Sequence, residues 1–206
     1  GTNWKKSCFE CDFSNPVIGN NGPLCEGATL NLTSSLIPGA TYSWTGPDGF
    51  TSSVQNPSVP NTTTAASGTY NLTVSLNGCS TGPVSTSANV NPVPSAPSLS
   101  SNSPLCAGST LNLTASTISG ATYNWTGPNG FASNQQNPSI ANASTSASGN
   151  YNVSATLNGC TSTIASTGAI VNPHPDSSFT YSPPSPSITQ NVTFTPTAGA
   201  LSYQWT

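Results

Sequence analysis

Charged side chains are nearly missing from this sequence. Only 2 of its 206 residues are Lys or Arg and only 5 are Asp or Glu, whereas roughly a quarter of the residues in ordinary soluble domains are charged. Both positive charges, Lys5 and Lys6, lie near the beginning of the sequence. Because neutralising phosphates requires clustered Lys and Arg, the composition argues against nucleic-acid binding. It argues against attraction to an anionic membrane surface for the same reason.

Long apolar runs are also missing. The longest contain three or four residues, far fewer than the ~20 that a membrane-spanning helix needs. We therefore expect no membrane insertion. The sequence contains no Met, and no charged region followed by an apolar stretch opens it, so we expect it to begin at a mature terminus or inside a longer polypeptide.

Groups that support catalysis are sparse as well. The five acidic residues are scattered, and the sole histidine, His174, lies in the proline-rich stretch Asn172-Pro173-His174-Pro175. Hydrolases of the common kinds need a carboxylate pair, a nucleophile with a base, or a metal ion. We expect no enzyme activity, no catalytic or metal site, and no cofactor.

What the sequence does contain is an 81-residue unit that occurs twice. Between Pro23–Pro94 and Pro104–Pro175, 44 of 72 positions are identical without a gap. The pattern then begins a third time, with Val192, Phe194, Tyr203 and Trp205 at the corresponding spacing. The predicted domains are an N-terminal segment (1–14), two repeats (15–94 and 95–175) and an incomplete third repeat (176–206). In repeat arrays, function usually comes from length, stiffness and displayed surface.

Each repeat has the pattern of an all-β sandwich. Short alternating runs such as Thr29–Thr33, Thr41–Thr45 and Gly68–Val74 are separated by clusters of Gly, Pro, Asn and Ser. Asn77-Gly78 and Asn158-Gly159 are strong hairpin dipeptides. Five aromatic residues are predicted to lie in the cores: Trp44, Trp125, Tyr70, Tyr151 and Trp205.

These residues resemble a known fold. The motif Gly27-x-x-Leu30-x-Leu32, Trp44 on the next strand and Ser67-Gly68-x-Tyr70 resemble strands B, C and F of the immunoglobulin fold, with Tyr70 and Tyr151 as candidate tyrosine corners. Gly46-Pro47-Asp48-Gly49-Phe50 and Leu76-Asn77-Gly78-Cys79 further resemble the Ig-like and PKD-like repeats of large surface proteins from gliding-type bacteria. The resemblance implies tandem β-sandwiches arranged head to tail and secretion by the type IX system.

Six cysteines in a sequence of this composition indicate disulfides. The simplest pairing is within each repeat, Cys25 with Cys79 and Cys106 with Cys160. Strand order offers an alternative, because Cys25 and Cys79 are expected at opposite ends of one sandwich. Cys25 would then bond to Cys160, and an N-terminal cysteine to Cys79. Free or intermolecular thiols are a third possibility.

The remaining cysteines form the motif Cys8-Phe9-Glu10-Cys11, which has the spacing of a redox motif or half a zinc site. No second Cys-x-x-Cys motif accompanies it. We expect a local disulfide or two bonds to other segments.

The leading functional hypothesis is a structural repeat segment of a long secreted or cell-surface fibre, stalk or adhesin that self-associates into a filament. Proline-rich joints and nearly uncharged faces favour it, because they limit flexibility and electrostatic repulsion. The alternative is a module that binds glycans or cell surfaces, either as an adhesin tip or as an accessory to a polysaccharide-degrading enzyme. Phe50 and Phe131 are the candidate ligand contacts for that alternative.

Overall fold

The computed structural model describes residues 13–174, 179–182, 184, 189 and 191–196. The chain divides into two compact units. The first comprises Gly1–Ser95 together with Ala155–Thr163, and the second comprises Ala96–Ser154 and Ile164–Thr206. A nine-residue segment of the second sequence repeat therefore packs with the first repeat.

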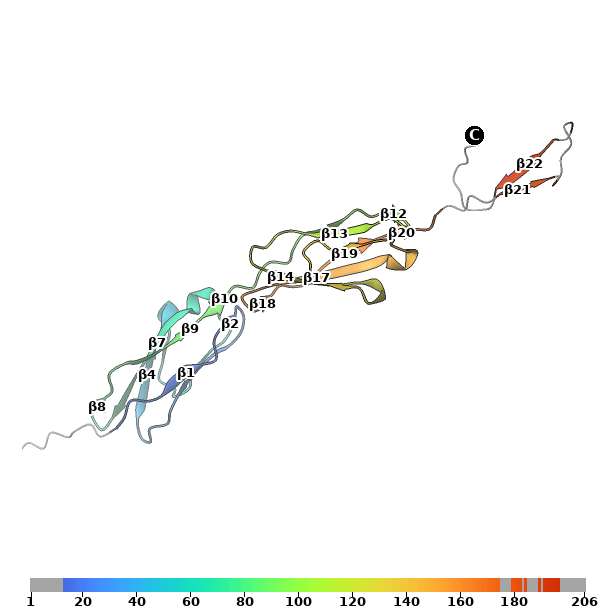
Figure 1. The fold of residues 1–206 in the computed structure, drawn as a ribbon. Coiled ribbons are helices and arrows are strands. Elements are labelled where there is room, and N and C mark those ends of the chain that lie inside the picture. Colours follow the sequence, from blue (N-terminus) through green and yellow to red (C-terminus); the bar gives the residue numbers. More distant parts are fainter. Residues whose placement is uncertain (1–12, 175–178, 183, 185–188, 190, 197–206) are drawn as a thin grey trace, which may run out of the picture. The chain divides into compact units, whose positions relative to one another are not determined.

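The first repeat contains two antiparallel sheets and one short parallel pair (Figure 1). One sheet has the order β1-β3-β6, with β1 at Ile18–Asn20, β3 at Leu30–Ser34 and β6 at Ser58–Val59. The other has the order β5-β4-β7-β8, with β5 at Thr51–Ser52, β4 at Thr41–Thr45, β7 at Gly68–Leu76 and β8 at Cys79–Ser80; β9 at Val84–Ala88 also pairs with β7. The parallel pair joins β2 (Leu24–Cys25) to β10 (Val90–Asn91).

The second repeat has the same topology. Its first sheet has the order β11-β13-β16, at Leu99–Ser101, Leu111–Ala115 and Ser139–Ile140. Its second has the order β15-β14-β17-β18, at Ala132–Ser133, Thr122–Thr126, Gly149–Leu157 and Cys160–Thr161, and β19 at Ala165–Ala169 pairs with β17. The parallel pair is β12 (Leu105–Cys106) with β20 (Val171–Asn172). These sheets confirm the predicted all-β, immunoglobulin-like sandwich fold.

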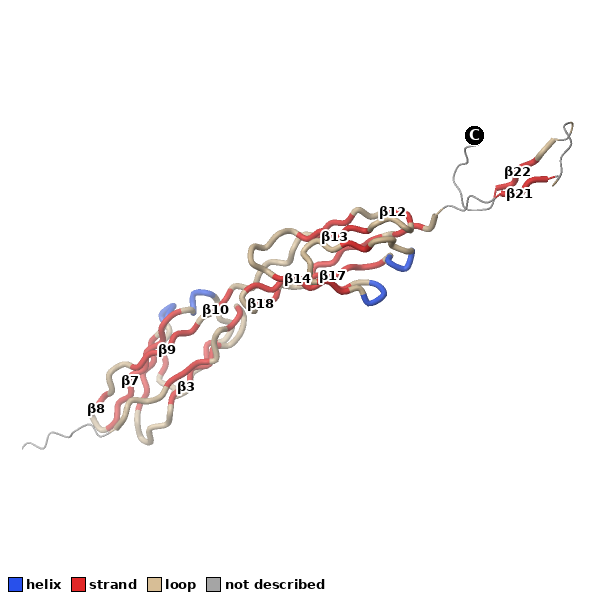
Figure 2. The backbone as a smooth tube through the Cα atoms, viewed as in Figure 1, coloured by secondary structure: helices blue, strands red, loops and turns tan. Residues whose placement is uncertain are grey.

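Helical structure in the described residues is limited to single 3-10 turns (Figure 2). They are η1 (Pro47–Gly49) and η2 (Thr64–Ala66) in the first repeat, and η3 (Pro128–Gly130) and η4 (Thr145–Ala147) in the second. Asp48 and its counterpart Asn129 both have φ 53°. Asp and Asn tolerate this left-handed conformation better than most residues, which explains why the two exchange at this position.

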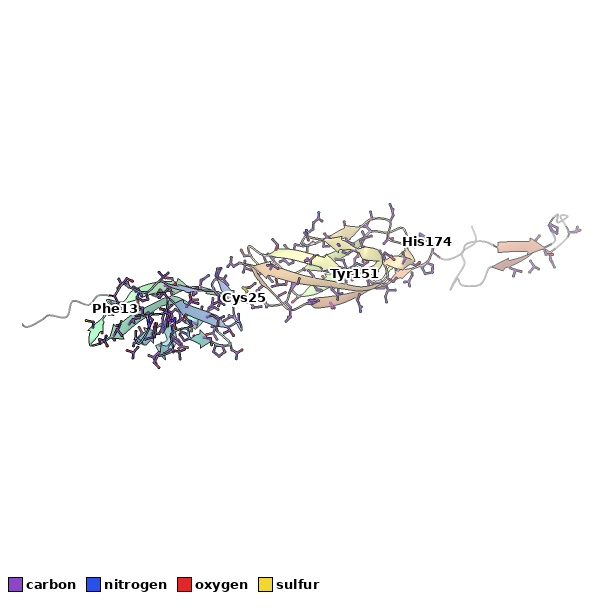
Figure 3. All side chains as sticks on the ribbon, turned by 90° about the horizontal axis from the view of Figure 1, so that it is seen from below. Phe13, Cys25, Tyr151 and His174 are labelled. Atoms are coloured by element: carbon purple, nitrogen blue, oxygen red, sulfur yellow. A yellow bond between two sulfur atoms is a disulfide. The ribbon has the colours of Figure 1, made fainter. Side chains whose placement is uncertain are left out.

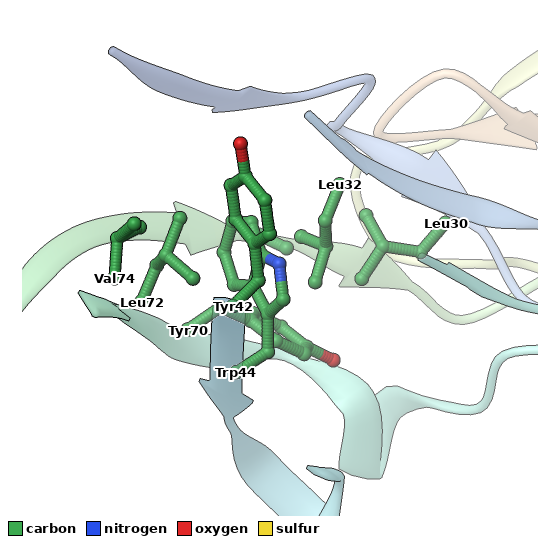
Figure 4. Close-up of a cluster of buried hydrophobic side chains, with 8 residues drawn as sticks. Leu30, Leu32, Tyr42, Trp44, Tyr70, Leu72 and Val74 are labelled. Carbon is green, nitrogen blue, oxygen red and sulfur yellow. The ribbon is translucent and has the colours of Figure 1, made fainter. Parts of the chain in front are cut away.

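The core of the first repeat follows directly from alternation along the strands. In β3 and β4 every second side chain is buried, which brings Leu30, Leu32, Tyr42 and Trp44 between the sheets. Tyr70, Leu72 and Val74 enter from β7 (Figure 4). Trp44 is 1% exposed, and its ring nitrogen donates a hydrogen bond to the Gln55 carbonyl oxygen at 3.2 Å. The indole therefore fills the core without leaving its N–H unpaired.

The two predicted hairpin turns have the expected geometry. Asn77 and Gly78 have φ values of 51° and 82°, and they connect β7 to β8 with Leu76 opposite Cys79. Asn158 and Gly159 repeat this arrangement at φ 50° and 81°. Positive φ at both central residues is the requirement of a type I′ turn, and Asn-Gly satisfies it with little strain.

Beyond the second repeat, β21 (Phe179–Ser182) and β22 (Thr193–Pro196) form an antiparallel pair. Phe194, which the third start of the repeat pattern includes, therefore belongs to a strand. Tyr203 and the candidate core residue Trp205 lie outside the described residues. The proposed domain boundaries at 14, 94 and 175 remain predictions.

Candidate functional site

A disulfide links Cys25 of the first sequence repeat to Cys160 of the second. The two cysteines are 135 positions apart in sequence, and their Cα atoms lie 5.6 Å apart, within the usual range for a bridge. Cys25 ends β2, and Cys160 begins β18 in the segment Ala155–Thr163 that packs with the first repeat. Figure 3 labels Cys25 at this position. We call the turn Leu157-Asn158-Gly159-Cys160 the docked hairpin.

Hydrogen bonds and sulfur contacts hold the docked hairpin beside the disulfide. The Asn91 side-chain amide donates to the Asn158 carbonyl oxygen at 3.1 Å. Asn89 in turn donates its side-chain amide to Asn91 Oδ1 at 2.8 Å, which orients the Asn91 amide. The Cys160 sulfur lies 3.9 Å from the Asn91 carbonyl oxygen and is nearly inaccessible, with Cys160 1% exposed. The disulfide therefore lies beside polar contacts that also attach the docked hairpin to the first repeat.

The within-repeat pairing of Cys25 with Cys79 is wrong, and so is that of Cys106 with Cys160. Val90 pairs with Leu24, next to Cys25, and its backbone exchanges hydrogen bonds with the Ser67 hydroxyl immediately before β7. Cys79 lies opposite Leu76 at the other end of β7. Eight residue steps separate the two ends, roughly 26 Å at ~3.3 Å per residue. Bridged Cα atoms lie within about 7 Å, so the sandwich itself separates Cys25 from Cys79.

The other cysteines differ from this pair. Cys79 is also disulfide-bonded, and its bond to an N-terminal cysteine remains a prediction. Cys106, the counterpart of Cys25, is free and exposed. Cys8 and Cys11 lie outside the described residues.

Tyr70 and Tyr151 form the same buried corner in the two repeats. Both are 0% exposed, and each hydroxyl donates a 2.8 Å hydrogen bond to the carbonyl oxygen four residues earlier, Ala66 or Ala147. Burial raises the pKa of the Tyr70 phenol above its ordinary value, and the nearby Asp48 charge adds to the increase. Burial likewise raises the pKa of Tyr151. The neutral phenol is thus the form that the folded state favours.

Phe50 and Phe131 pack against these tyrosines. The Phe50 ring meets the Tyr70 ring edge to face with centroids 5.5 Å apart, and Phe131 meets Tyr151 in the same way at 5.3 Å. Both phenylalanines are half-buried. A groove of about 280 Å³ lies beside Phe131, lined also by Asn129, Ile140 and Asn142. The role of the phenylalanines as ligand contacts remains a prediction.

Sequence reasoning missed the glycines that make this packing possible. A Cβ atom at Gly127 would lie 2.5 Å from Tyr151 Cδ1, and one at Gly46 would overlap the Tyr70 ring in the same way. Glycine at these positions lets the chain pass directly over the ring. The signal was present in the duplicated Gly-Pro-Asp/Asn-Gly-Phe motif, which indicated a turn without showing what the turn covers. The role of Asn91 in holding the docked hairpin was not predicted, because no residue near it in sequence indicates that its side chain binds Asn158.

Tyr70→Phe is expected to lower the free energy of unfolding of the first repeat by about 1–3 kcal/mol, because it leaves the buried Ala66 carbonyl oxygen without its donor. The measurement is guanidinium denaturation of the full chain at neutral pH, followed by fluorescence. Tyr151→Phe is the matched variant in the second repeat and should give a loss of similar size.

The same variants should also change how the free energy of unfolding depends on pH. The folded-state pKa of Tyr70 is raised. The contribution of its neutral phenol to the free energy of unfolding is therefore complete below the ordinary tyrosine pKa of about 10, and it is lost as pH rises toward the folded-state value. Tyr70→Phe should therefore weaken the alkaline loss of stability. An unchanged alkaline loss in both variants would contradict this assignment.

The described residues contain little else that indicates chemistry. Among them, no group of three or more His, Cys, Asp and Glu side chains is placed to hold a metal ion. His174 is exposed and follows β20 (Figure 3). No helix in the described part of the chain has both the length and the apolar character to cross a bilayer.

Comparisons with known proteins agree with this architecture. Residues 94–173 match the family described as Ig-like domain, CHU_C associated. A chain in the crystal structure of the mouse coronavirus receptor-binding domain complexed with its murine receptor is 14% identical, with a TM-score of 0.51, and the match covers 76% of this chain and 100% of that chain. For murine CEACAM1b the identity is 13% and the TM-score 0.48, with coverage of 77% and 100%. No protein of curated function matches the sequence. Residues 94–173 are therefore similar to the CHU_C-associated type of Ig-like domain, and the sheets of both repeats have the immunoglobulin-like sandwich fold.

Proposed function

We propose that this chain is a structural segment of a long extracellular surface fibre, stalk or adhesin, and that copies of it self-associate. The observation that carries the proposal is the Cys25–Cys160 disulfide. A bond within one repeat stabilises only that repeat. A bond from the first repeat to the second makes it harder to pull the docked hairpin away from the first repeat, which is the property that a load-bearing segment needs.

The composition of the exposed strand faces supports self-association. In β4 the outward side chains are Thr41, Ser43 and Thr45, and in β3 they are Asn31 and Thr33. These faces carry hydrogen-bonding groups without charge. Like-charge repulsion, which keeps many proteins apart in solution, is therefore nearly missing.

The proposal also places the chain outside the cell. Disulfides persist in oxidising environments and are rare in reducing cytosol, and Cys25, Cys160 and Cys79 are all disulfide-bonded. Resemblance of the repeat to those of type IX-exported surface proteins supports the same location.

Sedimentation-velocity ultracentrifugation of the full chain tests self-association. We expect assembly that increases with protein concentration and changes little between low and high salt, because few charges are available to be screened. A strictly monomeric particle at every concentration and salt level would rule out the filament.

The groove beside Phe131 motivates the one competing function, glycan binding. Aromatic rings commonly provide apolar contact area in ligand pockets. A monomeric chain that bound glycans on an array, with binding lost in Phe131→Ala and kept in Ile164→Ala, would favour that function over the fibre. Ile164 is a suitable control because it is 70% exposed and does not line the groove.

A further inference from the structure

The second repeat presents the same attachment framework that holds the docked hairpin in the first. In the first repeat, Cys25 lies beside Asn91 in the parallel pair β2–β10. In the second, Cys106 lies beside Asn172 in the parallel pair β12–β20. Backbone hydrogen bonds repeat as well: Glu26 N–H donates to the Asn91 carbonyl oxygen at 2.9 Å, and Ala107 N–H donates to that of Asn172 at 2.7 Å. The two frameworks therefore have equivalent backbone geometry.

The two frameworks differ in what covers them. Cys25 and Asn91 are half-buried and contact the docked hairpin, whereas Cys106 and Asn172 are both exposed. Ile170 takes the place of Asn89 and is 57% exposed. Cys106 is thus an unbonded thiol, whereas Cys25 at the equivalent position is bonded. Next to Cys106 lies Asn172, the counterpart of Asn91, whose amide binds the hairpin carbonyl.

We propose that Cys106 and Asn172 form a covalent docking site for a Leu-Asn-Gly-Cys hairpin of another immunoglobulin-like repeat. Both repeats of this chain carry that hairpin, at 76–79 and 157–160. The Asn172 amide donates to the carbonyl oxygen of the incoming Asn, as Asn91 does to Asn158. The incoming Cys then bonds to Cys106. The partner's identity as a repeat rests on the proposed function, but the bond itself can be tested without reference to a fibre.

The bond forms by thiol–disulfide exchange with an external disulfide such as oxidised glutathione. The Cys106 thiolate attacks one glutathione sulfur, and the first glutathione thiolate leaves. The thiolate of the incoming hairpin Cys then attacks the Cys106 sulfur and releases the second glutathione. Two protein thiols lose two protons and two electrons, and one glutathione disulfide becomes two glutathione thiols.

The test lengthens the full chain by one repeat, with a second copy of residues 95–175 placed directly after Pro175. The copied hairpin Cys then lies 135 positions after Cys106, the same separation as between Cys25 and Cys160. After equilibration with reduced and oxidised glutathione, non-reducing peptide mapping should recover a peptide that joins Cys106 to the copied Cys. Cys25–Cys160 is the internal control for correct folding.

Asn172→Ala in the lengthened chain tests the amide contact separately. Loss of one hydrogen bond should make the new disulfide about threefold to tenfold easier to reduce by glutathione, whereas Ile164→Ala should leave it unchanged. If Cys106 stays free or bonds to Cys106 of a second molecule while Cys25–Cys160 forms normally, the docking site is disproved. That result would leave the sedimentation test of self-association unaffected, because sedimentation is measured on the chain without the added repeat.

Discussion

Replacing both Cys25 and Cys160 by Ser should lower the free energy of unfolding by up to about 5 kcal/mol. The disulfide closes a loop of 135 residues, and restricting the unfolded chain over such a loop corresponds to about 5 kcal/mol in the loop-entropy description. The figure is an upper bound because most of the loop folds into a domain of its own. Guanidinium denaturation of the full chain, followed by tryptophan fluorescence, provides the measurement.

Cys106→Ser is the matched control for this prediction. Cys106 occupies the equivalent position in the second repeat and is free and exposed, so its replacement should change stability by less than about 0.5 kcal/mol. The double variant should also release the docked hairpin, seen as faster amide hydrogen exchange at Leu157 and Thr161 in the β17–β18 pair. Equal stability of the double variant and Cys106→Ser would contradict a stabilising role for the disulfide.

Trp125→Ala should destabilise the second repeat by about 3–5 kcal/mol, the usual cost of truncating a fully buried large aromatic side chain. Trp125 is 0% exposed, and its ring nitrogen donates to the Gln136 carbonyl oxygen at 3.3 Å. Alanine leaves a cavity in the sandwich and an unpaired carbonyl oxygen. Because a domain of this size has only about 5–10 kcal/mol to lose, the variant should populate unfolded second repeat at room temperature.

Circular dichroism and guanidinium denaturation measure this effect, with Trp44→Ala as the equivalent variant in the first repeat. Trp125→Phe should show a smaller loss, since it keeps a ring in the core but loses the hydrogen bond. Ile164→Ala, at a 70% exposed side chain, should change stability by less than about 0.5 kcal/mol. A loss below about 1 kcal/mol for Trp125→Ala would show that the indole does not support the sandwich.

Local sequence patterns were sufficient to predict the strands. Alternation in Thr29–Thr33 and Thr41–Thr45 predicts two-faced strands, and the structure has β3 at Leu30–Ser34 and β4 at Thr41–Thr45 with alternate side chains buried. Asn-Gly predicted both hairpins because few other dipeptides adopt positive φ at two successive residues. These features depend on residues within about ten positions of one another, so a single sequence contains the information.

The disulfide pairing, unlike the strands and hairpins, could not be predicted from local sequence patterns. Six cysteines allow 15 pairings, and the simplest, Cys25 with Cys79, fails because β7 places them at opposite ends of the sandwich. Strand order alone offered the Cys25–Cys160 alternative without selecting it. The choice among the cysteine pairings depends on Asn91, whose amide binds a carbonyl oxygen 67 positions away. It also depends on a close approach of segments distant in sequence, which no local pattern encodes.

The sequence by itself determined the fold class, the duplication and the aromatic residues suited to the core, because alternation and turn chemistry are local properties of the chain. Only the tertiary structure decided which cysteine bonds to Cys25, what covers the Tyr70 ring and that Cys106 is exposed. Those outcomes depend on which distant segments come within a few ångströms of one another. The sequence restricts such approaches, but packing and hydrogen bonding among all the segments select among them.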